Sequence, residues 1–151
     1  MTAPWPSSQA LLLLSILVAC RPVPAADGPR SVQRSSNPGE SLQEKRAFVE
    51  RYVTFRRNYH ALDYAISHHN NSNGCLPGPS DTDITLIAKV PLSELPQWTA
   101  GLSPAPHRPD SAPNLPSSIA TDGVTAWFEG PSKVVGIDPQ RGIVVYNIWS
   151  H

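Results

Sequence analysis

The stretch that decides the fold is TAWFEGPSKVVGIDPQRGIVVYNIW, residues 125–149. It contains three segments rich in apolar and β-branched side chains, at residues 125–129, 133–137 and 143–149, a composition typical of strands. The turn sequence GPS separates the first pair, and DPQRG separates the second. Proline suits the second position of a turn, and glycine suits the positive φ that follows. Consecutive hairpins of this kind predict an antiparallel meander with one apolar face that another element must cover.

Two further strands are expected before this meander. Residues 84–90, ITLIAKV, alternate in polarity and are rich in β-branched side chains, and Pro91 ends the run. Between residues 61 and 68 the apolar side chains also alternate, which favours a strand over a continued helix. The residues between these two runs are rich in asparagine, glycine and proline, so we expect a long loop there.

An amphipathic helix is expected from Ser41 to about Tyr59. Ser41 is followed three residues later by Glu44, the pattern of a capping box at a helix N-terminus. At 100° per residue the aromatic side chains of the segment fall on one face. These aromatic residues are Phe48, Tyr52, Phe55 and Tyr59. The face they form would cover the sheet.

Arg56 is the exception on this helical face. It falls inside the apolar arc, so we expect a buried ion pair with a carboxylate such as that of Asp63. An anion-binding site at Arg56 is the alternative. The other cations are dispersed around the helix, whereas a membrane-binding helix would gather its cations on one face.

Together these elements predict an α+β fold, with one N-terminal amphipathic helix packed on a mainly antiparallel sheet of about four or five strands. The length of 151 residues allows one domain, which we expect over residues 41–151. Residues 20–40 have little to bury and predict a flexible tether, and residues 99–122 contain five prolines and predict an irregular excursion. The tryptophans beyond the first 19 residues are expected in the core or at its edge. They are Trp98, Trp127 and Trp149.

Residues 1–19 have the pattern of a signal peptide. The apolar run ALLLLSILVA, residues 10–19, is half the length of roughly twenty residues that a membrane-spanning helix needs. Its last residues, Leu17-Val18-Ala19-Cys20, resemble the lipobox of bacterial lipoprotein precursors. The resemblance implies cleavage after Ala19 and lipidation of Cys20, which would anchor the protein to a membrane of the cell envelope. The first nine residues contain no lysine or arginine, so the positive charge that usually begins a signal peptide would come from the amino terminus alone. Cleavage after Ala25 is the rival reading, and it would leave a soluble secreted or periplasmic protein.

The two cysteines are not expected to form a disulfide. Cys20 is either lipidated or removed with the leader, so Cys75 would be the single cysteine of the domain. A catalytic thiolate at Cys75 would need a neighbouring base, and His68 and His69 are close in sequence. An inert thiol is the simpler expectation.

The charges of the chain balance, with 12 basic and 12 acidic residues, and this argues against a nucleic-acid-binding protein. They are unevenly distributed, however. Residues 1–59 contain 8 basic and 4 acidic residues, and residues 60–151 contain 4 basic and 8 acidic residues. Docking of the two parts on each other is the first explanation. The alternative is a basic surface for anionic lipid headgroups or for an acidic partner.

One polar cluster could carry chemistry at the mouth of the expected long loop. Its members are His68, His69, Asp81, Asp83 and Cys75. Adjacent histidines on a strand point to opposite faces, so one of them at most joins any given site. We therefore expect no metal site, and no cofactor motif or catalytic set is apparent in the sequence. The sequence favours an exported binding or interaction domain, for example an inhibitor with an envelope protein as partner. An envelope hydrolase that uses the His68, Asp81, Asp83 and Cys75 region is the alternative.

Overall fold

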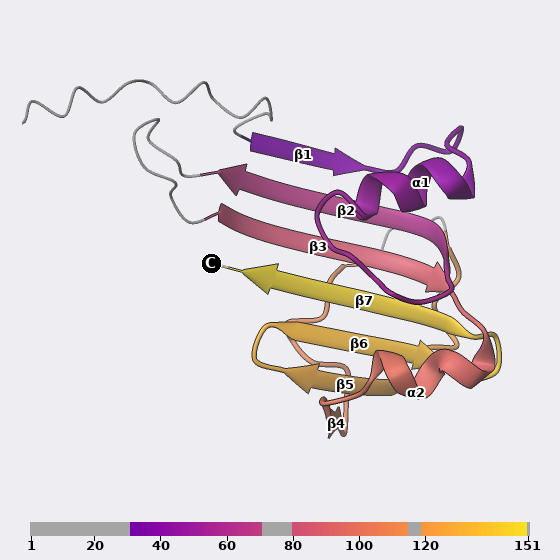
Figure 1. Cartoon of the computed structure of the whole chain (residues 1–151). Helices are drawn as coiled ribbons and strands as arrows, with labels where there is room; N and C mark the ends of the chain where they lie inside the picture. The colour runs from indigo at the N-terminus through magenta and orange to yellow at the C-terminus, as the bar shows by residue number, and fades with distance from the viewer. Residues whose placement is uncertain (1–30, 71–79, 115–118, 151) are drawn as a thin grey trace, which may run out of the picture.

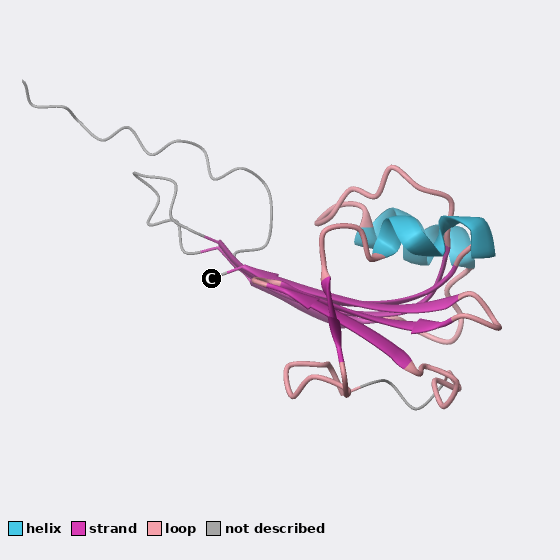
Figure 2. Ribbon diagram, turned by 90° about the horizontal axis from the view of Figure 1, so that it is seen from below, coloured by secondary structure: helices cyan, strands magenta, loops and turns pink. Residues whose placement is uncertain are grey.

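The computed structural model describes residues 31–70, 80–114 and 119–150, which form a seven-stranded antiparallel sheet with short helices on one face (Figures 1 and 2). The strands are β1 (Ser31–Ser35), β2 (His60–Asn70), β3 (Ser80–Lys89), β4 (Ser103–Ala105), β5 (Ala126–Gly130), β6 (Lys133–Asp138) and β7 (Ile143–Ser150). The helices are α1 (Leu42–Val49) and α2 (Leu95–Trp98), and a 3₁₀ turn at Leu92–Glu94 leads into α2. The strand order is β1-β2-β3-β7-β6-β5-β4, and every neighbouring pair is antiparallel.

The expected α+β fold with about four or five strands is wrong, because the described part of the chain is a seven-stranded sheet with only two short helices. The expected central strands are confirmed as β2, β3, β5, β6 and β7. The strands that the sequence pattern missed are the two edges, β1 and β4. An edge strand pairs on one side only and need not bury alternate side chains, so the sequences SVQRS and SPA show no strand pattern.

The position of β1 also changes the expected domain boundary. Residues 31–35 were expected within a tether that extends to residue 40, but they pair with β2 in the sheet. The sheet therefore includes residues that were expected in the tether. The proposed signal peptide, Cys20 and Cys75 lie outside the described residues.

Helix α1 is much shorter than the expected helix over residues 41–59. Its N-terminus has the expected capping box, with the Glu44 amide donating to Ser41 Oγ at 3.2 Å and the Ser41 amide donating to Glu44 Oε2 at 2.8 Å. The helix ends at Val49, and residues 50–59 cross over the sheet towards β7 (Figure 1). The β-branched pair Val53-Thr54 disfavours a helix there, and a non-helical chain advances further per residue than a helix. We call residues 50–59 the crossing segment.

The crossing segment delivers aromatic side chains to the face of the sheet that carries the helices, here called the helix face. The ring centroid of Phe55 lies 5.0 Å from that of Tyr146 on β7 and 5.1 Å from that of Trp98 in α2. Tyr59 also contacts Phe55 and Trp98. The aromatic periodicity in this stretch therefore marks core contacts, as expected, but a non-helical chain makes most of them.

A smaller core lies on the opposite face, here called the back face. Trp127, Val134 and Val145 are buried there, and Ala112 and Val124 pack against them. Both come from the segment between β4 and β5, whose described loops lie on the side of the sheet opposite to the helices (Figure 2). The expected placement of the tryptophans is confirmed. Trp98 and Trp127 are buried, and Trp149 is half-buried at the edge of the back-face core.

Candidate functional site

The polar cluster expected from the sequence is divided between the two faces of the sheet. His68 lies on the helix face, with its Nδ1 2.8 Å from Thr82 Oγ1 and its ring 5.4 Å from that of Tyr52. His69 and Asp81 are directly opposite each other on β2 and β3, one residue further along, and therefore lie on the back face. Cys75 is outside the described residues. Within residues 31–70, 80–114 and 119–150, no group of three or more His, Cys, Asp or Glu residues could hold a metal ion.

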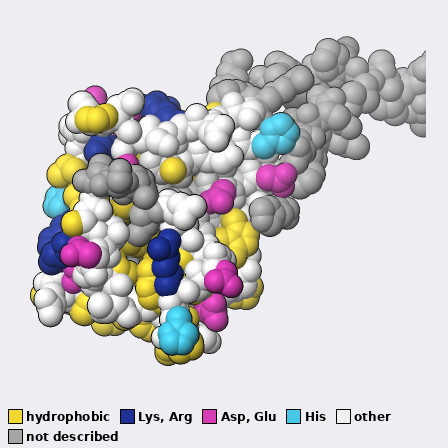
Figure 3. Space-filling view, turned by 180° about the vertical axis from the view of Figure 1, so that it is seen from behind, with side chains coloured by type: hydrophobic (Ala, Val, Ile, Leu, Met, Phe, Trp, Pro, Cys, Tyr) yellow, Lys and Arg dark blue, Asp and Glu magenta, His cyan; other side chains and the backbone are white. Residues whose placement is uncertain are grey.

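Asp83, also on the back face, is a hydrogen-bond acceptor for a buried amide. Asn147 Nδ2 lies 2.8 Å from Asp83 Oδ1 and 3.2 Å from both the Ile84 carbonyl and Thr85 Oγ1. Because Asn147 is buried, it needs these acceptors. Figure 3 shows the back face, where acidic and histidine side chains are interspersed with apolar ones. Asp83 thus has a structural function in the sheet.

Arg56 and Asp63, the expected buried ion pair, have different surroundings. Asp63 is buried and accepts hydrogen bonds from Ser36 Oγ and from the Tyr64 amide. Arg56 is exposed on the crossing segment. The ion pairs that link described residues are Arg34–Glu40, Arg46–Glu50, Arg141–Asp122 and Arg141–Asp138, and the expected pair is not among them. The physical reason is that α1 ends before Arg56, so Arg56 has no position on a helical face.

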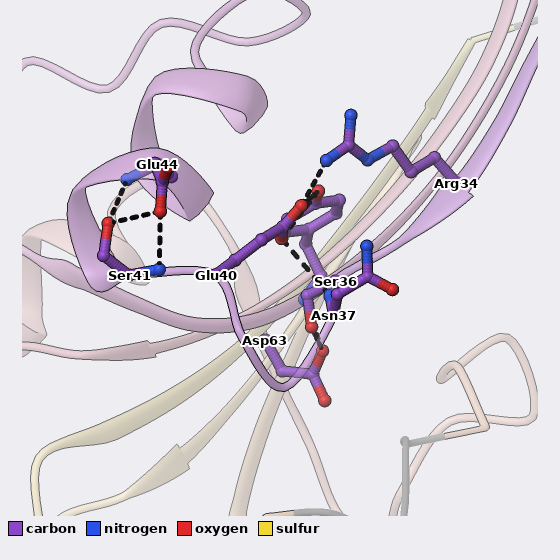
Figure 4. Close-up of polar contacts among 8 residues, drawn as sticks. Arg34, Ser36, Asn37, Glu40, Ser41, Glu44 and Asp63 are labelled. Carbon is purple, nitrogen blue, oxygen red and sulfur yellow. Dashed lines mark hydrogen bonds and ion pairs between the residues drawn. The ribbon is translucent and has the colours of Figure 1, made fainter.

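A second carboxylate, Glu40, ties β1 and the start of α1 to β2 (Figure 4). It accepts hydrogen bonds from the Arg34 guanidinium group, from the Tyr64 hydroxyl at 3.1 Å and from the Asn37 amide at 3.3 Å. Burial raises the pKa of Glu40, but these hydrogen bonds together outweigh burial and hold the pKa below its ordinary value. All of these partners are groups of the protein, so the contacts are structural.

A further candidate site is a pocket on the helix face, with a volume of about 480 Å³. It is lined by Val53, Thr54, Phe55, Arg56, Arg57, Lys133 and Tyr146. Phe55 is held in the aromatic core, and its neighbours Arg56 and Arg57 line the pocket beside it. Lys133 and Tyr146 come from the adjacent strands β6 and β7, where Lys133 pairs with Ile148 and Val135 pairs with Tyr146. We call this site the cationic pocket.

The charges of the cationic pocket are all positive. Arg56, Arg57 and Lys133 line it without any aspartate or glutamate, and none of them belongs to the ion pairs of the described residues. Two of the cations pack over aromatic rings. Arg57 Cζ lies 5.4 Å from the ring centroid of Trp98, and Lys133 Nζ lies 5.8 Å from that of Tyr146. These contacts position the cations but do not neutralise them.

Tyr146 adds a neutral donor to the pocket wall. The residue is only 5% exposed, and no hydrogen bond joins its hydroxyl group to the described part of the chain. Burial raises the pKa of Tyr146, and the nearby Arg57 acts in the opposite direction with a smaller effect. The hydroxyl therefore stays protonated at neutral pH and can donate a hydrogen bond to a group in the pocket.

A second pocket of about 470 Å³ lies beside the crossing segment, but its charged groups are already engaged. Arg46 Nε lies 2.9 Å from Glu50 Oε1, and the Lys89 ammonium group donates to the Arg141 carbonyl. The Tyr59 hydroxyl donates to Glu50 at 3.2 Å. Of the two pockets, the cationic pocket is therefore the one whose arginine and lysine side chains form no hydrogen bond or ion pair with the described residues.

The ion pairs of the described residues also bear on the uneven charge along the sequence. Arg34 and Arg46 pair with glutamates of their own half of the chain, Glu40 and Glu50, and not with acids of the second half. Docking of a basic half on an acidic half is therefore not what holds the domain together.

Sequence reasoning singled out Arg56 of the cationic pocket, but it could not add Lys133 and Tyr146, because their proximity to Arg56 depends on the path of the crossing segment.

The chain matches no protein-family model, no curated protein and no solved structure. Among the described residues, neither helix has the length and apolar character needed to span a membrane.

Proposed function

We propose that this protein is a binding domain and that the cationic pocket takes an anionic ligand. One observation carries the proposal: three cations line a pocket whose lining includes no aspartate or glutamate, and Tyr146 lines the same pocket. Among the described residues the Tyr146 hydroxyl is not a fully buried atom without a partner, so it is open to the pocket and can donate to a ligand acceptor. Positive charge and donors in one concave site favour an anion.

Binding fits the geometry better than hydrolysis. His68, a candidate base of the alternative function, bonds to the Thr82 hydroxyl and lies on the face opposite to His69 and Asp81. A hydrolase needs a nucleophile, a base and an orienting group within reach of one another. The cationic pocket instead contains groups that hold charge and donate hydrogen bonds, and its lining includes neither a carboxylate nor a histidine.

We also propose that the domain acts outside the cytoplasm, attached to a membrane of the cell envelope through a lipid on Cys20. The support is the sequence Leu17-Val18-Ala19-Cys20 at the end of a short apolar run. The ligand would then be an anion, or an acidic group of a partner, in the envelope.

A titration with phenyl sulfate, a singly charged aryl anion, tests the binding function. We expect saturable binding, followed by the fluorescence of the tryptophans, because Arg57 of the pocket packs over Trp98. Benzyl alcohol, a neutral counterpart, should not compete. The double variant Arg56→Gln/Lys133→Gln should weaken binding by about tenfold or more, since hydrogen bonds to charged groups contribute about 1.5–3 kcal/mol.

The matched control is Arg51→Gln/Arg108→Gln, which removes the same net charge from positions outside the pocket lining. It should bind phenyl sulfate as the unmodified protein does. Equal weakening in both double variants would reduce the effect to overall charge and would overturn the proposal, as would absence of binding.

A further inference from the structure

We infer that the ligand of the cationic pocket carries a phosphate monoester group, and that the pocket prefers this dianion to a carboxylate or a sulfate ester. The inference rests on the proposed function and specifies the chemistry of its ligand. It is carried by the number of cations, the shape of their donors, the neutral hydroxyl groups beside them and the size of the pocket.

The number of cations favours a dianion. Arg56, Arg57 and Lys133 line one pocket, and no acidic residue is among its lining residues. A carboxylate or a sulfate ester brings a single negative charge and would leave most of this positive charge unneutralised. A phosphate monoester carries about −1.5 to −2 at pH 7, so it matches the site more closely.

The donors fit the terminal oxygens of a phosphate group. A guanidinium group can present two parallel N–H donors to a phosphate, and an ammonium group acts as a compact point charge beside it. The pocket has two of the former, Arg56 and Arg57, and one of the latter, Lys133. Thr54 and Tyr146 line the same pocket, and their side chains carry hydroxyl groups that can act as neutral donors. Together they offer a partner for each of the three terminal oxygens.

The size of the pocket indicates an ester and not a free phosphate ion. A volume of about 480 Å³ lies within the range of roughly 300–1,000 Å³ that is usual for small-molecule sites. A water molecule occupies roughly 30 Å³ of liquid, so an inorganic phosphate ion would leave most of the space empty. Val53 and Phe55 provide an apolar part of the lining against which the organic group of an ester can pack.

The test compares three ligands with the same aromatic ring: phenyl phosphate, phenyl sulfate and benzoate. At pH 7.5 we expect phenyl phosphate to bind at least about tenfold more tightly than the other two, because its second charge meets a cation that they leave unpaired. The variant Arg56→Gln/Lys133→Gln should remove this preference, and Arg51→Gln/Arg108→Gln should keep it. The thermal unfolding of each variant shows whether a loss of binding is due to a loss of the overall fold.

The pH dependence of binding tests whether the preference for phenyl phosphate comes from the second negative charge of the ligand or from its shape. The ionisable groups that line the pocket, from the crossing segment, β6 and β7, are Arg56, Arg57, Lys133 and Tyr146, and none of these residue types changes charge between pH 5 and 7.5. The second pKa of a phosphate monoester is about 6, so the ligand alone loses charge as the pH falls. Phenyl phosphate affinity should therefore drop several-fold towards pH 5, while the affinity for phenyl sulfate stays constant.

The outcomes distinguish this inference from the function on which it rests. Equal affinities for all three ligands would overturn the phosphate preference and leave the anion-binding function standing. If none of the three ligands bound, the phosphate preference and the anion-binding function would both be overturned. A final arm with vesicles that contain phosphatidic acid, against vesicles that contain phosphatidylglycerol, identifies the source of the group, because only the first lipid carries a phosphate monoester. Binding to the first alone assigns a lipid headgroup, and binding of soluble phenyl phosphate without vesicle binding assigns a soluble ester.

Discussion

At the scale of single residues, Trp98 combines extensive ring packing with a hydrogen-bond donor that no described residue satisfies. It is 1% exposed and packs against the rings of Phe55, Tyr59 and Tyr146. Its indole N–H is nevertheless without a hydrogen-bond partner among the described residues. A buried donor left unsatisfied costs about 1–3 kcal/mol, so this side chain stabilises the domain through its ring and destabilises it through its N–H group.

The two contributions can be separated by substitution. Trp98→Phe keeps an aromatic ring and removes the unbonded donor, so we expect a loss of less than about 1.5 kcal/mol in the free energy of unfolding. Trp98→Ala leaves a cavity between three rings and should cost about 3–5 kcal/mol. Urea unfolding at neutral pH measures both. If Trp98→Phe were as costly as Trp98→Ala, the smaller ring would not replace the packing of the indole, and the expected gain from removing the unbonded N–H would be contradicted.

Burial of the tryptophans could be predicted at this scale, but the cationic pocket could not. An aromatic side chain in a small domain is expected in the core whatever the topology. Arg56 was conspicuous because it interrupts an apolar pattern, and an anion-binding site was one of its two interpretations. Its companions Lys133 and Tyr146 lie more than 70 residues further along the chain, and no local pattern links them to Arg56.

At the scale of elements, the local signals were reliable where a strand is buried and failed where it is an edge. The three-strand meander of β5, β6 and β7 could be predicted because alternating apolar residues and turn sequences agree. β1 could not, because it is mostly exposed and pairs only with β2 among the described strands. The periodicity of residues 48–59 is compatible with a helix, but from residue 50 contacts with the sheet determine the path.

Besides its backbone pairing with β2, the edge strand β1 is attached through the Glu40 carboxylate, which bonds to Arg34 of β1 and to Tyr64 of β2. Its folded-state pKa lies below the ordinary value of 4.5. The carboxylate therefore contributes stability that is fully present above about pH 4.5 and is lost as the pH falls through the lower folded-state pKa.

The variant Glu40→Gln tests this attachment. It should be less stable than the unmodified protein at pH 7, and the difference should disappear as the pH is lowered towards 3 in a series of urea unfolding curves. Hydrogen exchange should show faster opening of the β1 amides, with little change in β6 and β7, because the lost contacts are local. Glu129→Gln, at an exposed position of β5, is the control and should leave both readouts unchanged. A stability difference that persists unchanged at pH 3 would contradict the proposed function of the carboxylate.

At the scale of the whole molecule, the sheet relates the cationic pocket to the N-terminal end of the domain. β1 and β6 run in the same direction, and Lys133 lies in the row of paired residues that continues through Ile148, Ile84 and Ile66 to Arg34. Four strand spacings separate Lys133 from Arg34, about 19 Å. The pocket residue Lys133 and the start of β1 at Ser31 therefore lie at the same end of the sheet (Figure 1).

This arrangement gives the proposed lipid anchor a geometric consequence. Cys20 and Ser31 are eleven residue steps apart, and a fully extended chain of this length reaches at most about 40 Å. A lipid on Cys20 would hold the pocket end of the sheet close to a membrane surface. The anchor and a phosphate-bearing ligand of the envelope are thus compatible, although each is tested by itself.

Expression of the full-length chain in a bacterium tests the anchor. We expect the protein in the membrane fraction, with a mature N-terminus at Cys20 and the added mass of a diacylglyceryl group, because Leu17-Val18-Ala19-Cys20 lies at the end of an apolar run too short to span a bilayer. Cys20→Ala should abolish the lipid mass and release the domain into the soluble fraction. Cys75→Ala should leave both unchanged, which shows that the effect belongs to one thiol. A mature chain that begins at Ala26 without lipid would establish the rival cleavage, and the domain would then act as a free soluble binder.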